Sequence, residues 1–107
     1  MAEPVTVIYV TAPDEAAARA IGQAVVAERL AACANILPGM RSLYWWQGKL
    51  EEATETVLIL KTVESAAARV IERVRALHPY DVPCAIALPV RDGNPDYLAW
   101  IRAETHA

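Results

Sequence analysis

The chain has few of the residues that usually indicate catalytic or metal chemistry. Its 107 residues include only two cysteines and two histidines, with no CxxC or HxxxH spacing, so no ready-made zinc motif is present. The four glycines are scattered, which argues against a phosphate-binding loop. The sequence also contains no recognisable Ser–His–Asp pattern or pair of catalytic carboxylates. These absences favour a binding protein over an enzyme.

Basic residues are also scarce and dispersed. Ten Lys and Arg stand against 13 Asp and Glu, for a net charge of -3, so we do not expect a nucleic acid as partner. The N-terminal segment lacks a basic region, and its apolar run from Val5 to Val10 is too short for a signal-peptide core or a membrane span. We therefore expect a cytoplasmic protein with no membrane segment, in which both thiols stay reduced.

Apolar residues, by contrast, are abundant. The length predicts a single domain, residues 1–107, and 55% of its residues are hydrophobic, more than a solvated monomer of this size needs. The run Leu43-Tyr44-Trp45-Trp46 would place large side chains on both faces of a strand. A small domain cannot cover both faces by itself. The sequence therefore predicts an oligomer in which another chain buries at least one of the two tryptophans.

Hydrophobic periodicity and turn residues predict a β-α-β-β-α-β order followed by a C-terminal helix. The expected elements are a strand at 5–11, a helix from Asp14 to about Leu30, a strand from Cys33 to Trp46 bent at Pro38-Gly39, a strand from Glu51 to Val63, a helix that Ser65 caps and Pro79 ends, a strand at 85–88 buried on both faces, and a short helix that Asn94 caps. This order is typical of the α+β ferredoxin-like, or split βαβ, sandwich. Gly22 costs the first helix roughly 1 kcal/mol against alanine, which indicates close helix–sheet packing.

Five blocks occur in order along the chain: ERLAACANILPG, SLYWWQGKLEE, LILKT, HPYDVP and ALPVRDGNPDYLAWI. Together, from about Val7 to Ile101, they resemble the CutA family of divalent-cation-tolerance proteins. The resemblance implies a ferredoxin-like subunit in a homotrimer, related in architecture to PII signalling proteins. It also implies a role in tolerance of copper and other divalent metal ions, without an established reaction. One departure from the family pattern matters, because Cys84 stands where a glutamate is usual, whereas Asp81 replaces another glutamate and keeps a carboxylate.

Three side chains could ligate a metal ion. Cys33 and Cys84 offer thiolates, which suit copper(I) or zinc, and His78 offers an imidazole at a helix end. Each also has an ordinary structural interpretation. Free cysteine is among the most buried residue types, and His78 could simply hydrogen-bond the last carbonyls of its helix. The sequence leaves both interpretations open.

A second set of residues could bind a small anionic ligand in clefts between subunits, by analogy with PII proteins. Lys61 lies in an otherwise apolar strand, so its ammonium must reach solvent, a carboxylate or an anion. Tyr80, Tyr97 and Trp100 could line the same cleft, although aromatic core packing explains them equally well. The leading hypothesis is a trimer that binds copper or another divalent metal ion. The alternatives are an anion-binding sensor or adaptor and a scaffold without a ligand.

Overall fold

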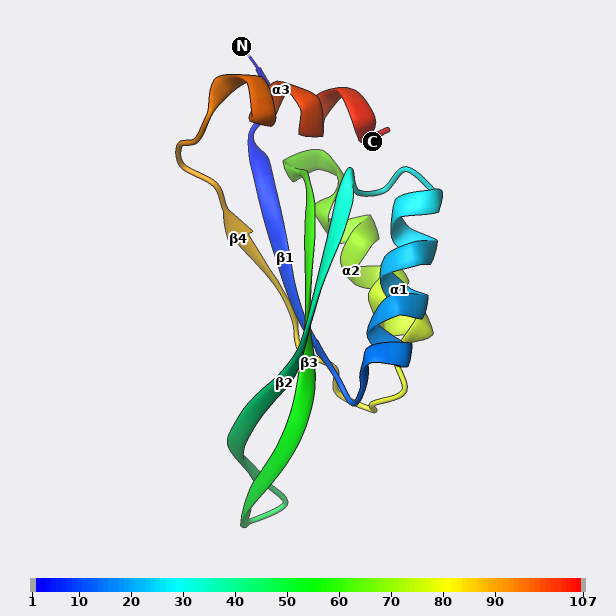
Figure 1. Ribbon diagram of the computed structural model, residues 1–107, viewed down its shortest axis with the longest axis vertical. Helices are drawn as coiled ribbons and strands as arrows, with labels where there is room; N and C mark the ends of the chain where they lie inside the picture. Colours follow the sequence, from blue (N-terminus) through cyan, green and yellow to red (C-terminus); the bar gives the residue numbers. More distant parts are fainter. Residues whose placement is uncertain (1, 107) are drawn as a thin grey trace.

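The computed structural model describes residues 2–106. Its elements are, in order, β1 (Val5–Ala12), α1 (Glu15–Ala27), β2 (Cys33–Trp46), β3 (Lys49–Val63), the 3₁₀ turn η1 (Glu64–Ala66), α2 (Ala67–Leu77), β4 (Ala85–Pro89) and α3 (Pro95–Glu104). The four strands form one antiparallel sheet in the order β2-β3-β1-β4 (Figure 1). This confirms the α+β class and the predicted order of elements. Among the described residues, no helix is both long enough and apolar enough to cross a membrane.

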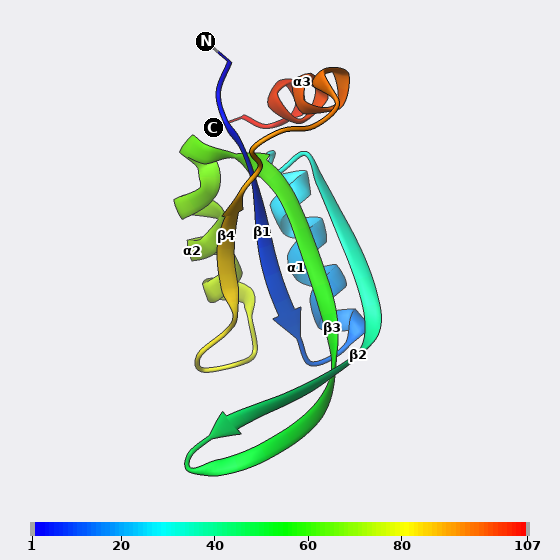
Figure 2. The same ribbon diagram turned by 90° about the vertical axis from the view of Figure 1, so that its left-hand side faces the viewer.

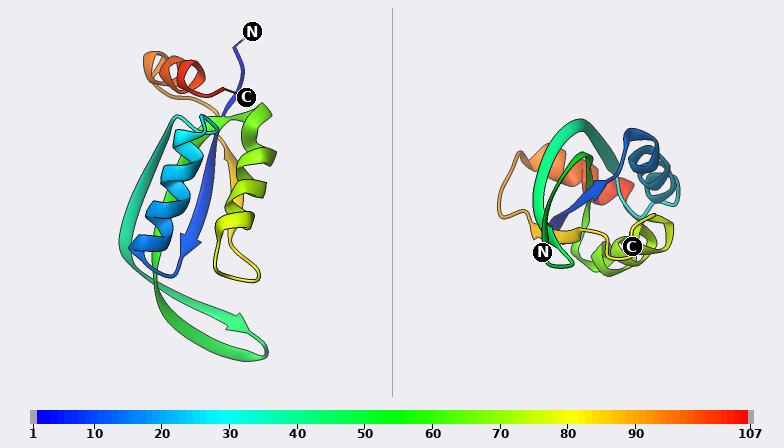
Figure 3. Two further views of the ribbon diagram at one scale, coloured as in Figure 1. Left: turned by 90° about the vertical axis from the view of Figure 1, so that its right-hand side faces the viewer. Right: turned by 90° about the horizontal axis from the view of Figure 1, so that it is seen from below.

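The hydrophobic core lies between the sheet and two helices. α1 and α2 lie side by side over one face of the sheet (Figure 3). Ile8, Leu58 and Leu60 point into this layer from β1 and β3 and are fully buried, together with Val25 of α1 and Val70 of α2. α3 lies at one end of the sheet, where it contacts β1 and β3. Two helices on a single face leave the other face of the sheet without a helical layer.

α1 is shorter than the sequence predicted, because it ends at Ala27 instead of near Leu30. Arg29 adopts a left-handed conformation with φ 62°. The backbone N–H groups of Arg29 and Leu30 donate back to the carbonyls of Val26 and Val25, at 3.0 and 3.1 Å. This is the Schellman arrangement, which satisfies the last carbonyls of a helix and stops it. Glycine usually occupies that left-handed position, so an arginine gave no visible stop signal.

Two further expectations are wrong. Ser65 does not cap α2, because it lies inside η1 and α2 starts with no side-chain cap hydrogen bond. Its N–H donates instead to the Glu3 carboxylate at 3.0 Å. β4 is not buried on both faces of the single chain either, since Ile86 and Leu88 are 51% and 46% exposed. The helical layer covers only the opposite face of the sheet.

We call the uncovered side of the sheet the open face. Residues paired across neighbouring strands share a face, and pairing aligns Cys33 with Lys61, Lys61 with Val7, and Val7 with Leu88. Beyond the sheet, the β2–β3 hairpin continues and curls under the sheet's end (Figure 2). On the outer side of that hairpin Trp45 is 73% exposed. Large apolar surfaces of the isolated chain therefore lie on the open face and on the hairpin.

Candidate functional site

The candidate residues fall into two separate groups. The first lies where α3 approaches β3 and consists of Cys33, Lys61, Tyr97 and Trp100. The second lies where β1 ends beside the α2–β4 loop and consists of His78, Tyr80 and Cys84. Among residues 2–106, no group of three or more His, Cys, Asp and Glu side chains is placed to hold a metal ion. One chain therefore does not bring the three expected metal ligands together.

Lys61 is the centre of the first group. Its Nζ donates to the Tyr97 hydroxyl at 3.1 Å and lies 5.3 Å from the centre of that ring. The hydrogen bond raises the pKa of Lys61, so its ammonium stays charged. Tyr97 stacks on Trp100 with ring centres 5.6 Å apart, and Cys33 Sγ lies 3.8 Å from the Tyr97 hydroxyl. Three of the four residues predicted for ligand binding are thus neighbours, and one predicted metal ligand lies beside them.

His78 uses both of its ring nitrogens within the chain. Its Nδ1 lies 3.1 Å from the backbone N–H of Tyr80, which can only donate, so Nδ1 is the acceptor. Nε2 then carries the proton and donates to the carbonyl of Thr11 at 2.7 Å. The ring is buried and ties the end of β1 to the turn after α2. This arrangement leaves neither nitrogen of His78 free to bind a metal ion.

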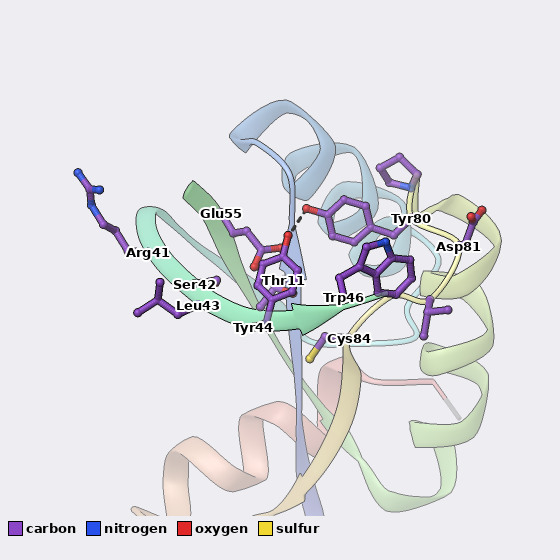
Figure 4. A pocket seen from close by; sticks show the side chains of 12 residues that line it. Thr11, Arg41, Ser42, Leu43, Tyr44, Trp46, Glu55, Tyr80, Asp81 and Cys84 are labelled. Carbon is purple, nitrogen blue, oxygen red and sulfur yellow. Dashed lines mark hydrogen bonds between the residues drawn. The ribbon is translucent and has the colours of Figure 1, made fainter. Parts of the chain in front are cut away.

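Tyr80 belongs to a cavity of about 810 Å³ between the hairpin and the α2–β4 loop (Figure 4). Its hydroxyl donates to Glu55 Oε2 at 3.0 Å. Burial, together with the neighbouring Glu55 carboxylate, raises the pKa of Tyr80 to about 12. The hydroxyl is therefore neutral and keeps its proton for the carboxylate. Tyr80 is separated from Lys61, Tyr97 and Trp100, so the four residues predicted for one anion site do not form a single group.

Glu55 is the residue of this cavity that the sequence interpretation missed. It lies on β3 opposite Met40, next to the irregular pairing between Leu37 and Met40. In the sequence it follows the charged and polar stretch from Glu51 to Thr54, which is typical of a solvated strand end. The available signal was its period-two spacing with Val57, which places both side chains on the same face of β3.

Both thiols are free and half-buried. Cys33 begins β2 and lies on the open face, with Sγ 3.9 Å from Asn35 Oδ1. Cys84 lines the cavity just before β4, with Sγ 4.0 Å from the carbonyl of Tyr9. Neither belongs to the core cluster between the sheet and the helices. The two sulfur atoms are therefore placed where another molecule or another chain can reach them.

Comparison with known proteins gives a consistent result. Residues 6–104 match the family described as CutA1 divalent ion tolerance protein. The chain is 50% identical over 99 residues to the divalent-cation tolerance protein CutA of Thermus thermophilus, covering 92% of this chain and 96% of that protein. It is 46% identical over 103 residues to the protein CutA of Mus musculus, covering 96% of this chain and 58% of the mouse protein.

Solved structures resemble the fold closely. The divalent cation tolerance protein Cut A1 from Thermus thermophilus superposes with a TM-score of 0.92 at 49% identity, covering 95% of this chain and 99% of that one. CutA1 from Oryza sativa superposes with a TM-score of 0.93 at 45% identity, covering 97% of this chain and 95% of that one. A third structure is described as the periplasmic divalent cation tolerance protein CutA from Archaeoglobus fulgidus. It superposes with a TM-score of 0.90 at 40% identity, covering 94% of this chain and 97% of that one.

Proposed function

Because the chain belongs to the CutA1 divalent ion tolerance family, we propose that it acts in the response to metal ions by binding copper or another thiol-seeking ion between the subunits of a homotrimer. The family name describes a tolerance and not a reaction, so the proposal is a binding function. The observation that carries it is the position of Cys33 and Cys84, which are free and lie outside the core. Sulfur ligands suit copper(I) and zinc better than magnesium. Thiols that stay reduced also fit a cytoplasmic location.

A site between subunits follows from the number of ligands. Protein zinc sites generally use three or four protein ligands, and the described residues of one chain offer no such group. His78 would have to break two hydrogen bonds to take part. A neighbouring subunit must then supply the remaining ligands. The apolar open face and the exposed hairpin provide the surface on which such a neighbour would pack.

A site for a small anionic ligand has less support. Among the residues predicted for it, Lys61 is the single cation, and its ammonium is already held by the Tyr97 hydroxyl. Tyr80 lies in the other group, against the Glu55 carboxylate, which would repel an anion. The arrangement of the second group therefore favours a positively charged ligand.

Metal titration tests the proposal. Under anaerobic conditions, we expect calorimetry to show stoichiometric binding of zinc and copper(I), and weaker binding of magnesium. The Cys33→Ser, Cys84→Ser double variant should lose the tight binding, because serine is a poor ligand for soft ions. Cys84→Glu, which restores the usual family residue, should narrow the preference for zinc over magnesium.

His106→Gln is the matched control, since His106 is exposed and belongs to neither group. It should leave the tight binding unchanged, which separates the thiol site from binding at exposed imidazoles. Undiminished zinc and copper(I) binding by the double serine variant would contradict thiol ligation.

A further inference from the structure

The cavity beneath the hairpin contains a buried carboxylate that the metal proposal does not use. This carboxylate is that of Glu55, which is only 8% exposed. No Lys or Arg among residues 2–106 lies within ion-pair distance of it. Its hydrogen-bond donor is the hydroxyl of Tyr80, a neutral group, at 3.0 Å. Burying a carboxylate without a compensating positive charge is costly, so this position is suited to receive a cation.

Three aromatic side chains, those of Tyr44, Trp46 and Tyr80, line the same cavity as that carboxylate. Figure 4 shows Trp46 beside Tyr80, and Tyr44 beside Glu55. Arg41 also borders the cavity but points away from it, toward the Glu52 carboxylate at 3.3 Å. The faces of tryptophan and tyrosine rings attract cations, and cages of such rings recognise quaternary ammonium groups. The cavity therefore combines three aromatic rings with the buried carboxylate of Glu55.

We propose that this cavity binds a small organic cation, an ammonium or guanidinium compound, whose charged group lies between the rings of Trp46 and Tyr80 and faces the Glu55 carboxylate. The cavity volume of about 810 Å³ lies within the range of roughly 300–1,000 Å³ that is usual for small-molecule sites.

An organic cation fits the lining better than a hard metal ion does. Magnesium and calcium require several oxygen ligands, whereas Glu55 is the one buried carboxylate of this cavity, and Asp81, which also lines it, is exposed. A lysine or arginine side chain from a neighbouring subunit carries the same chemistry as a free organic cation. Binding measurements with matched probes distinguish these two sources.

Choline and its uncharged carbon analogue 3,3-dimethyl-1-butanol form a matched pair of probes for calorimetry on the assembled protein. We expect choline to bind at least about tenfold more tightly than the neutral alcohol, since they differ in the charge that the rings and carboxylate recognise. Glu55→Gln keeps the shape of the side chain and can still accept from Tyr80. It should weaken choline binding by about tenfold or more, because a charge-assisted contact is lost.

Trp46→Leu should weaken choline binding similarly, whereas Trp45→Leu should leave it unchanged. Trp45 is the matched control, because successive strand residues face opposite ways and its ring lies on the outer side of the hairpin. Light scattering on each variant verifies that it assembles as the parent does. In NMR spectra of the indole N–H groups, choline should shift the resonance of Trp46 and leave those of Trp45 and Trp100 in place.

Equal affinity for choline and the neutral alcohol would overturn the proposal, as would choline binding that Glu55→Gln does not weaken. Absence of choline binding also overturns it. If choline does not bind and Glu55→Gln loosens the oligomer, the group that faces Glu55 is a lysine or arginine of a neighbouring subunit. Cys33 lies outside this cavity, beside Tyr97. Cys33→Ser should therefore weaken metal binding and leave choline binding unchanged, so this inference and the metal proposal can fail independently.

Discussion

At the scale of single residues, Tyr80 links the Glu55 carboxylate on β3 to His78 at the end of α2. Its hydroxyl holds the Glu55 carboxylate, and its backbone N–H fixes the proton of His78 on Nε2. The ring of Tyr80 also lies 4.8 Å from that of His78. A residue first considered as a ligand contact thus acts as a positioning group for a carboxylate and an imidazole. The same contacts explain why His78 cannot be judged as a metal ligand from its residue type alone.

The raised pKa of Tyr80 leads to a prediction at alkaline pH. Its pKa is about 12 in the folded chain against an ordinary value of 10.0, so the folded state favours the neutral hydroxyl. The stabilising effect is complete below pH 10 and is lost as the pH rises toward 12. Ultraviolet titration should show a late phenolate step near pH 12, and Tyr80→Phe should remove it together with the matching loss of stability. Tyr97→Phe is the control and should retain the late step. Survival of that step in Tyr80→Phe would assign the raised pKa to another residue.

At the scale of elements, locally encoded boundaries could be predicted from the sequence. Asn94 starts α3 by accepting from the N–H of Asp96 at 3.1 Å, and Pro79 ends α2 by placing His78 in an extended conformation. The end of α1 could not be predicted, because Arg29 takes a left-handed conformation that residue preference does not reveal. The exposure of β4 was also missed, since it depends on what covers the open face and not on the strand itself.

The candidate site was predictable only in part, for the same reason. The neighbourhood of Cys33 and Lys61 follows from strand register, which the sequence defines poorly across the bulge between Leu37 and Met40. The pairing of Tyr80 with Glu55 requires the hairpin to curl back toward a loop that is 25 residues away in sequence. Side-chain type identified candidate groups, but tertiary packing determined which of them meet.

Gly22 gives the element-scale prediction. A Cβ at this position would lie 3.1 Å from both Ala34 Cβ and Leu58 Cδ1, which confirms the close helix–sheet packing expected from the sequence. Helix propensity alone would make Gly22→Ala stabilising by about 1 kcal/mol. Ala34 Cβ is attached directly to the β2 backbone and cannot rotate away, so overpacking, typically about 1–3 kcal/mol, should outweigh that gain.

We therefore expect denaturant unfolding to show that Gly22→Ala lowers the free energy of unfolding by about 1 kcal/mol. Gln23→Ala is the matched control, because the next residue of the same helix is exposed and tests propensity alone. A Gly22→Ala protein more stable than the parent would mean that α1 moves away from the sheet at little cost.

At the scale of the whole molecule, the chain has one covered face and one uncovered face. Its extents of 47 × 25 × 22 Å reflect the hairpin, which projects beyond the helical layer (Figure 1). Leu43 and Leu50 are exposed on that hairpin, and Ile86 and Leu88 on the open face. The amount of apolar surface is larger than a small monomer normally exposes. A homotrimer would bury this surface, place the hairpin against a neighbour and complete a metal site between subunits.

Light scattering tests this assembly, and we expect a mass near three times the 11.7 kDa of the chain. Trp45→Lys should reduce the mass toward that of one chain. Within an isolated subunit Trp45 is 73% exposed, so lysine is tolerated there. In an assembly that buries this position, the same lysine places an unpaired charge in an apolar interface, at a cost of several kcal/mol. Gln23→Lys adds the same charge on the helical layer and should leave the trimer intact. A parent protein with the mass of a single chain would refute the trimer. A Trp45→Lys variant that still assembles fully would show that the outer side of the hairpin is not part of the interface.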